Sequence, residues 1–390
     1  MKKIKNKIIT IGPTTQNNKV VNGQSMMFQM LLDEMHNRNI KKIILDIGLS
    51  IFPNNTNRIS GKFSVIKSLD YIIIIIKLFI ILIFNGNQTV YITTAQSKVG
   101  FIRDYFIIYL ASLFGSKIIT HQFGANYRGF YNLQSKFLKK KIINTLLKVD
   151  TIIVEGDYTK KQFNFLPGFE SKVYALPNGL PEKIDTSIIQ PKKIIANEPI
   201  RILYLSNMIE SKGFWDVLEA VNVLINHDNL NVNAVFSGKF LESVDDKKFA
   251  NSNEAKKAFF DYLEKNNLKK SVIYVEGLYG INKSEEFHKA HFFLLPSYYI
   301  NEGQPVSVIE AMAYGCIPIV TKYRLIPLMV NINNGFFVNP KSPHEIVKII
   351  KDLSINIEKY NKFSQSTINY FLDNFTADKY TDRLISLLKI

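Results

Sequence analysis

The chain has 390 residues, of which 46% are hydrophobic and 21% are charged. This composition excludes a disordered or fibrous chain, and the length allows two domains, each with a core of ordinary size. The formal net charge of +16 is unevenly placed, since residues 1–182 hold 24 Lys and Arg against 10 Asp and Glu, whereas residues 183–390 hold 25 against 23. A basic first half indicates an anionic partner, such as a membrane surface, a nucleic acid or a phosphorylated substrate.

Cysteine content and hydropathy restrict the compartment. The single cysteine, Cys316, excludes an internal disulfide and fits a reducing environment. The longest apolar run covers residues 71–84 and has Lys77 in its middle. Because a membrane-spanning helix needs about 20 apolar residues, we expect this run to form a buried or surface-docking helix instead. The apolar residues 8–11 are too few for the core of a signal peptide.

Short apolar segments alternate with helix-period segments through the first half of the chain. Strands that alternate with helices of this length predict a parallel sheet with helices on both faces. The expected strands are residues 8–12, 42–47, 89–93, 117–120, 151–154 and 172–176, and the expected helices are residues 25–32, 71–84, 101–114 and 134–148.

A polar, proline-marked linker over residues 183–199 separates this half from a second group of strands. The same alternation continues after the linker, so we expect a two-domain α/β protein. The expected strands of the second half are residues 201–205, 232–237, 272–275, 291–297, 316–321 and 335–338, with terminal helices between residues 343 and 390.

Two glutamates frame the expected start of a helix in the second half. Glu302 precedes the helix, Glu310 lies inside it, and Pro305 suits its first turn because no N–H is needed there. Backbone N–H groups at a helix start are unpaired donors at a positive end, which makes a cradle for a diphosphate. These donors belong to Gln304, Val306 and Ser307.

The spacing of the two glutamates by itself leaves two interpretations open. Carboxylates on either side of a phosphate cradle could each accept hydrogen bonds from a pair of sugar hydroxyls. Alternatively, Glu302 only complements the positive helix end and Glu310 lies on a solvated face.

Two residues of the first half stand where a ligand could approach the chain. Gly23 follows the first strand and precedes a helix, a position that permits close approach to a phosphate and is equally typical of an ordinary turn. His121 follows the strand expected at residues 117–120 and precedes a glycine loop. A lone histidine is more often structural than functional. For both Gly23 and His121, a structural role and a ligand contact therefore stay open here.

Residues 296–315 carry a more specific pattern than the glutamate spacing. A proline-serine strand end precedes Glu302, and Glu310 begins the run Glu-Ala-Met-Ala-Tyr-Gly. The segment resembles the E-x7-E signature of the family 4 retaining glycosyltransferases of the GT-B fold, of the bacterial surface-polysaccharide type. The resemblance implies two Rossmann-like domains with a nucleotide-sugar cleft between them. These would be residues 1–182 and 200–370, with a C-terminal helix, residues 371–390, that returns to the first domain.

The resemblance also implies which residues touch the donor. His121, in an HxxG pattern, and Glu302 would orient the donor sugar, and Glu310 would hold the ribose hydroxyls. Lys212 would contact the pyrophosphate. Asn207 stands where many members carry an arginine, which leaves one cation fewer for the leaving group.

Other matching positions complete the implied donor site. Gly23 would approach the diphosphate, although a single glycine stands where the family often has two. The remaining donor contacts fall on Leu278, Tyr279, Gly303, Gln304, Val306 and Ser307.

The implied reaction is retaining, metal-independent hexosyl transfer from a nucleotide diphosphate sugar. The departing phosphate oxygen would take the proton of the acceptor hydroxyl. No Asp-x-Asp motif occurs, so we expect neither a metal nor another cofactor. A nucleotide-sugar epimerase of the same fold is one alternative. A basic nucleic-acid-binding module is another, but the motif-bearing half is nearly neutral, so no nucleic-acid partner is expected.

The acceptor is suggested by a basic amphipathic segment. Residues 134–148 hold five lysines interleaved with apolar side chains. This pattern suits an anionic membrane surface, where each lysine contributes ~1 kcal/mol at close approach, although a solvated helix face is the alternative. With the basic first domain, it favours a lipid-linked glycan acceptor in capsule, O-antigen or lipopolysaccharide synthesis. We therefore expect a cytoplasmic protein, peripheral at the inner face of the plasma membrane.

Overall fold

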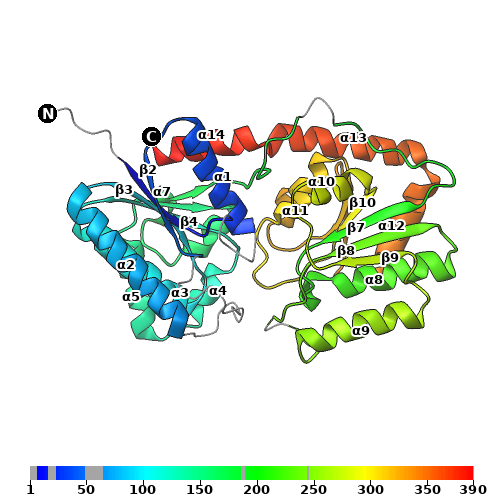
Figure 1. Cartoon of the computed structure of the whole chain (residues 1–390), viewed down its shortest axis with the longest axis horizontal. Coiled ribbons are helices and arrows are strands. Elements are labelled where there is room, and N and C mark those ends of the chain that lie inside the picture. Colours follow the sequence, from blue (N-terminus) through cyan, green and yellow to red (C-terminus); the bar gives the residue numbers. More distant parts are fainter. Residues whose placement is uncertain (1–6, 16–22, 49–64, 186–188, 244–245, 390) are drawn as a thin grey trace. The chain divides into compact units, whose positions relative to one another are not determined.

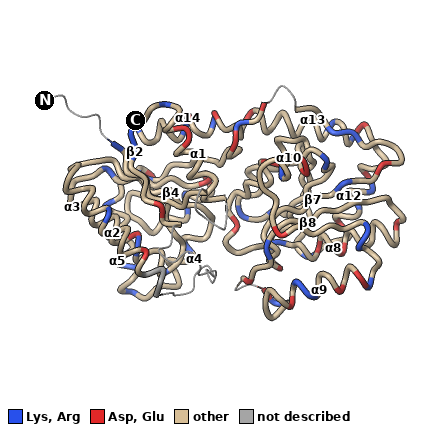
Figure 2. The backbone as a smooth tube through the Cα atoms, in the orientation of Figure 1, with Lys and Arg blue, Asp and Glu red and all other residues tan. Residues whose placement is uncertain are grey.

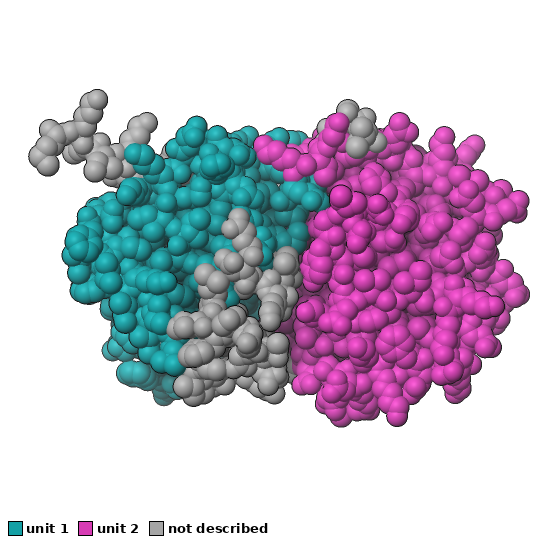
Figure 3. All heavy atoms as spheres, viewed as in Figure 1, with its two compact units in different colours: residues 1–182, 377–390 teal, residues 183–376 magenta. Residues whose placement is uncertain are grey.

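A computed structural model describes residues 7–15, 23–48, 65–185, 189–243 and 246–389. The chain forms two compact units, which Figure 3 colours separately. The first unit comprises residues 1–182 and 377–390, and the second comprises residues 183–376. Residues 183–199, expected to be a separate linker, are thus counted with the second unit. The C-terminal segment of the first unit begins at Ala377.

The first unit is built on a six-stranded parallel sheet with the order β2-β1-β3-β4-β5-β6. Helices cover both faces of such a sheet, which explains why its strands are almost continuously apolar. The strands are β1 Ile8–Gly12, β2 Lys42–Asp46, β3 Thr89–Thr94, β4 Lys117–Gln122, β5 Thr151–Val154 and β6 Val173–Ala175.

Two groups of helices cover this sheet. In Figure 1, α1 and α14 lie on one side of it and α2, α3 and α5 lie on the other. An ion pair between Arg38 and Asp382 links the end of α1 to α14. The helices of the first unit are α1 Gly23–Asn37, α2 Val65–Asn85, α3 Lys98–Leu113, α4 Tyr127–Asn132, α5 Lys136–Leu146, α6 Asp157–Lys160, the 3-10 turn η1 Lys161–Phe163, α7 Phe169–Lys172 and α14 Ala377–Leu388.

The second unit repeats this architecture, with a six-stranded parallel sheet in the order β12-β11-β10-β7-β8-β9. Its strands are β7 Ile200–Leu205, β8 Val232–Ser237, β9 Val272–Val275, β10 Phe292–Leu295, β11 Ile317–Thr321 and β12 Phe336–Val338. Its helical segments are η3 Glu210–Lys212, α8 Phe214–Asn222, η4 Val223–His227, α9 Ser252–Lys265, α10 Gly280–Lys289, α11 Val306–Ala313, η5 Ile326–Leu328, α12 Pro343–Ile355 and α13 Ile357–Asn374.

The two parallel sheets confirm the predicted α/β class, but two boundaries differ from the prediction. Pro305 precedes α11 as its N-cap, with ψ of 114°, so the helix begins at Val306. Strand β4 continues to Gln122, because β3 pairs with it as far as Thr94. His121 therefore lies inside a strand instead of after one. Among the described residues, no helix is both long and apolar enough to cross a membrane.

Candidate functional site

The first part of the site lies where two neighbouring strands of the second unit end. β7 and β10 are parallel partners, so the segments that follow them leave the same edge of the sheet. Lys212 in η3 follows β7, and its Nζ lies 2.9 Å from Oε1 of Glu302, which follows β10. The hydroxyl of Ser297 donates a hydrogen bond to the other carboxylate oxygen. Glu302 is buried, so this pairing offsets the cost of removing its charge from water.

A glycine allows these two segments to approach each other. Gly213 has φ of 80°, and a Cβ atom at this position would lie 2.6 Å from the carbonyl oxygen of Pro296. Just beside it, the backbone N–H of Tyr298 donates to the carbonyl of Ser211 over 2.7 Å. Only glycine combines this backbone conformation with the missing side chain. The glycine therefore sets how closely Lys212 comes to the loop that carries Glu302.

The second glutamate has its own cation. Glu310 is buried in α11, and its Oε1 lies 2.6 Å from Nζ of Lys283 in α10. Lys283 is not among the residues predicted from the sequence. Nothing in the local pattern distinguishes it from the exposed Lys289 of the same helix. Only the packing of α10 shows that Lys283 is buried and points to Glu310.

The start of α11 lies between the two glutamates in the sequence. The first N–H groups of a helix have no partner inside it, and Pro305 provides no side-chain cap. Val306 and Glu310 are four residues apart, so they lie on the same face of the helix, one turn from each other. Buried Gln304 precedes the helix. The arrangement thus combines backbone donors with two ammonium groups and two carboxylates, which suit phosphate and hydroxyl groups respectively.

The other predicted donor contacts of the second unit lie on separate segments. Asn207 follows β7 and is exposed, and its carbonyl accepts a hydrogen bond from the Tyr204 hydroxyl over 3.2 Å. Leu278 and Tyr279 follow β9, which β8 and β7 separate from β10 in the sheet. The structure therefore brings Lys212 to Glu302, whereas the predicted donor contacts Leu278 and Tyr279 leave the sheet three strands away from β10.

In the first unit, His121 is completely buried in β4. Its Nδ1 lies 2.7 Å from the hydroxyl of Tyr91, and its ring stacks on Phe123 at 4.1 Å between centroids. Nε2 has no hydrogen-bond partner among the described residues. Burial lowers the pKa of the imidazole to about 3, because the charged form would lose its hydration. The ring is therefore neutral at physiological pH and has one unused polar atom.

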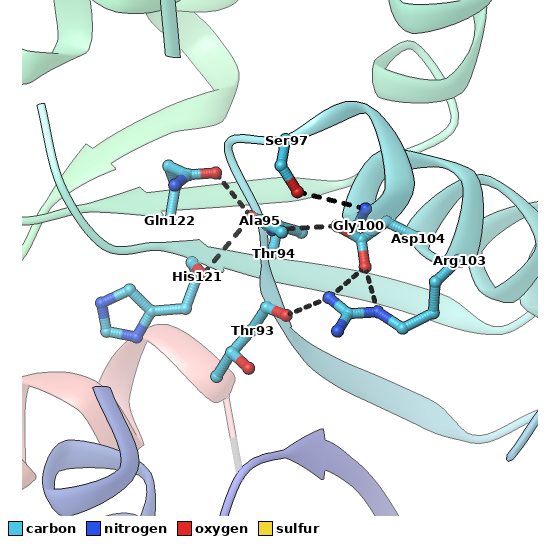
Figure 4. A network of polar contacts seen from close by, with 9 residues as sticks. All are labelled: Thr93, Thr94, Ala95, Ser97, Gly100, Arg103, Asp104, His121 and Gln122. Carbon is cyan, nitrogen blue, oxygen red and sulfur yellow. Dashed lines mark hydrogen bonds and ion pairs between the residues drawn. The ribbon is translucent and has the colours of Figure 1, made fainter. Parts of the chain in front are cut away.

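A polar network fixes the strand ends around His121 (Figure 4). The single O–H of Thr94 has two acceptors within reach, Oε1 of Gln122 at 2.9 Å and the carbonyl oxygen of His121 at 3.4 Å. The buried Asp104 accepts from the backbone N–H of Ala95 and pairs with Arg103, whose guanidinium also reaches the carbonyl of Thr93. These bonds hold the ends of β3 and β4 in register.

Glu155 connects the HxxG segment, residues 121–124, to the Pro-Asn-Gly segment at residues 177–179, which follows β6. Its carboxylate accepts from the backbone N–H of Gly124, in the HxxG segment, over 2.7 Å. The other oxygen accepts from the side-chain amide of Asn178, in the Pro-Asn-Gly turn, over 2.8 Å. Gly124 has φ of 86°, which favours glycine at this position. Sequence patterns did not indicate Glu155, because both partners are distant in the sequence.

Gly23 is the first residue of α1. The residues that precede it, 16–22, lie outside the described part of the chain. Its contact with a diphosphate therefore stays a prediction. Gly23 and His121 belong to the first unit, whereas the two Lys–Glu pairs belong to the second.

Residues 185–370 match the model of the family described as glycosyl transferases group 1. The matched segment is just under half of the chain and coincides with the second unit almost from end to end. The second unit is therefore a group 1 glycosyltransferase domain.

Solved structures share the fold of the whole chain. Anabaena HepE in complex with UDP has a TM-score of 0.68 at 11% identity, with 98% of this chain and 99% of that chain covered. Sucrose-phosphate synthase from Thermosynechococcus elongatus has a TM-score of 0.71 at 12% identity, with 98% of both chains covered. These similarities confirm the predicted GT-B fold.

A curated relative is similar over a short segment. The sucrose synthase of Melioribacter roseus is 31% identical over 94 residues. The match covers 23% of this chain and only 12% of that protein.

Proposed function

We propose that the protein is a retaining glycosyltransferase that transfers a sugar from a nucleotide diphosphate sugar to an acceptor hydroxyl. The observation that carries this proposal is the pair of buried Lys–Glu contacts around the start of α11, in a group 1 glycosyltransferase domain. Uncharged polar side chains would suffice to stabilise a loop. Two buried carboxylates, each held by an ammonium group, instead suit a ligand that has both hydroxyl and phosphate groups.

In this proposal the second unit binds the nucleotide and the leaving group. Glu310 accepts hydrogen bonds from the ribose hydroxyls, and Lys283 holds its carboxylate in place. Lys212 and the N–H groups of Val306 and Ser307 stabilise the negative charge that develops on the departing diphosphate. Preorganised donors of this kind can each lower a barrier by ~3 kcal/mol. Further donor contacts are proposed for Asn207, Leu278, Tyr279, Gly303 and Gln304.

The donor sugar would be oriented by Glu302 and by His121, with Gly23 near the diphosphate. A neutral His121 suits this role, because its free Nε2 can form a hydrogen bond to a sugar hydroxyl without adding a charge. The departing phosphate oxygen takes the proton of the acceptor, so the new bond forms on the face from which the leaving group departs. The cationic side chains and helix N–H groups supply the charge compensation, and we propose that no metal is used.

We propose UDP as the first donor nucleotide to test. HepE, which shares the fold, has been solved with UDP and with UDP-glucose. A thermal-shift screen of this chain with UDP, GDP, ADP and their sugars should show stabilisation by one nucleotide series. The Glu310→Gln variant should lose that stabilisation, whereas the Glu264→Gln variant, which alters an exposed ion pair, should keep it. Equal stabilisation of the Glu310→Gln and Glu264→Gln variants would contradict the proposal. Failure of every nucleotide to stabilise the wild type would also contradict it.

Two acceptors are proposed for test. The basic surface of the first unit favours a lipid-linked glycan in bacterial surface-polysaccharide synthesis, with the protein peripheral at the inner membrane face. The similarity to a sucrose synthase and a sucrose-phosphate synthase favours a small sugar or sugar phosphate instead. Nucleotide release on addition of each acceptor class separates these. It also separates transfer from epimerisation, which consumes no acceptor.

A further inference from the structure

Helix α2 exposes an apolar face along its whole described length. The exposed side chains recur at intervals of three or four residues, so they form one stripe on the helix. Ile74, Leu78 and Leu82, on the opposite side, are buried in the core of the first unit. A soluble helix normally presents polar residues to water, so this face is unusual. The stripe consists of Leu69, Ile72, Ile76, Phe79, Ile80, Ile83 and Phe84.

The apolar surface continues onto the neighbouring helix. α3 packs between α2 and α5, and the three helices lie side by side on one face of the sheet (Figure 1). Ile102 and Phe106 of α3 are four residues apart and are each about half exposed. We call this surface, formed by α2, α3 and α5, the α2–α5 face. Residues 71–84, for which the sequence left a buried and a surface-docking helix open, lie in α2, which is buried on one side and exposed on the other.

The charge around this face has a single sign. Helices α2, α3 and α5 contain eight Lys and Arg and two acidic residues, Asp70 and Asp104. Both carboxylates are buried, and Asp104 is paired with Arg103, so the three helices expose no carboxylate. On α5, Lys136 and Lys140 are exposed, and Lys141 lies over the Tyr105 ring of α3. Figure 2 shows the basic residues on this part of the first unit.

We propose that the α2–α5 face docks onto an anionic lipid bilayer, with the α2 stripe buried among the acyl chains and the α5 lysines at the headgroups. The combination of exposed isoleucines and cations matches the two layers of such a surface. A second copy of the chain would set like charges against each other. A nucleic acid would use the lysines but leave the isoleucines in water. The inference deepens the proposed function, because it identifies the surface that would bring the protein to a lipid-linked acceptor.

The proposal is tested by flotation of the full-length protein with vesicles. Neutral phosphatidylcholine vesicles are compared with vesicles that also contain phosphatidylglycerol. We expect recovery with the anionic vesicles, weakened by salt. The double variant Ile76→Gln with Ile83→Gln should reduce binding at least about tenfold, because two apolar side chains that would enter the acyl layer are lost. Lys136→Glu with Lys140→Glu should reduce it similarly and abolish the preference for anionic lipid.

Matched controls alter the same side-chain types in the second unit. Ile332→Gln with Ile355→Gln removes two isoleucines that are about 80% exposed, and Lys256→Glu with Lys257→Glu reverses two exposed lysines of α9. Both controls should bind vesicles like the wild type. Every variant is also checked for nucleotide stabilisation, so that failure to dock and failure of the donor site are read separately.

Three outcomes would overturn the proposal. The first is absence of flotation, or equal flotation with neutral and anionic vesicles. The second is loss of binding in the second-unit controls, which would show that the effect does not belong to the α2–α5 face. The third is oligonucleotide binding or self-association that the Ile76 and Ile83 substitutions abolish, which would assign this face to another partner.

Discussion

The two units share one architecture but differ in net charge. Each has a six-stranded parallel sheet with helices on both faces. The first unit has 27 Lys and Arg against 12 Asp and Glu, whereas the second has 22 against 21. In the second unit, Lys212 and Lys283 form buried ion pairs with glutamates. In the first unit, the lysines of α5 lie on the same face as the exposed apolar stripe of α2. The backbone architecture therefore does not determine the surface chemistry of a unit.

The candidate site residues of the two units differ in the kind of group that is buried. The second unit buries Glu302 and Glu310, each paired with a lysine. The first unit also buries an ion pair, Arg103 with Asp104, but its candidate site residue is a neutral histidine with an unused nitrogen. We therefore expect the second site to respond mainly to substitutions of charge and the first to respond to pH.

The largest expected effect concerns the Lys212–Glu302 pair. Glu302→Gln or Lys212→Ala should lower turnover at least about 100-fold, because both groups would act on charge that develops during the reaction. Sugar transfer is measured at saturating donor, with circular dichroism as the check on folding. Glu264→Gln, in an exposed pair with Lys269, serves as the control. Wild-type rates in both site variants would refute the assignment.

A smaller effect is expected at Lys283. Lys283→Met leaves buried Glu310 without its cation, which should reduce the free energy of unfolding by about 2 kcal/mol and weaken nucleotide binding. Urea unfolding and calorimetric titration with the nucleotide measure the two effects. The double variant Lys283→Met with Glu310→Gln should regain much of the stability but not the binding. Recovery of both would mean that the pair is structural.

Two glycines with similar backbone conformations separate packing from strain. Gly213 and Gly168 have φ of 80° and 70°, but only Gly213 has atoms within reach of an added Cβ. Gly168→Ala should cost about 1 kcal/mol from backbone strain alone. Gly213→Ala should cost more and weaken nucleotide binding, because η3 must move away from Pro296. Equal unfolding free energies for the two variants would contradict the importance of this close approach.

The last prediction is a dependence of stability on pH. Burial lowers the pKa of His121 to about 3 and that of His291 to about 4. The unfolded chain takes up these protons near pH 6.5, so stability is lost as the pH falls from about 6.5 towards these lower values, by at most ~1.4 kcal/mol per pH unit for each histidine. His121→Asn should flatten this slope in urea unfolding between pH 7 and 5. The variant His36→Asn, at an exposed position, serves as the control. An unchanged slope in His121→Asn would show that His121 is not held as a neutral, buried imidazole.

Strand positions were the most predictable feature of the fold. Strands β5, β8 and β9 lie at the predicted residues 151–154, 232–237 and 272–275. A strand that is buried on both faces forms a continuous apolar run, which the sequence displays directly. Boundaries were less predictable. The extension of β4 through His121 depends on pairing with β3, and the start of α11 depends on how the chain enters from Pro305.

By itself, the sequence determined the alternating α/β pattern, the concentration of positive charge in the first half and the Glu302–Glu310 segment at a helix start. These are properties of neighbouring residues, because backbone periodicity and helix ends are local. Only the tertiary structure decided that Lys283 pairs with Glu310, that Glu155 joins Gly124 to Asn178, and that α2 turns an apolar face to water. Such contacts depend on which distant segments pack together, and one helical pattern can be buried or exposed according to what covers it.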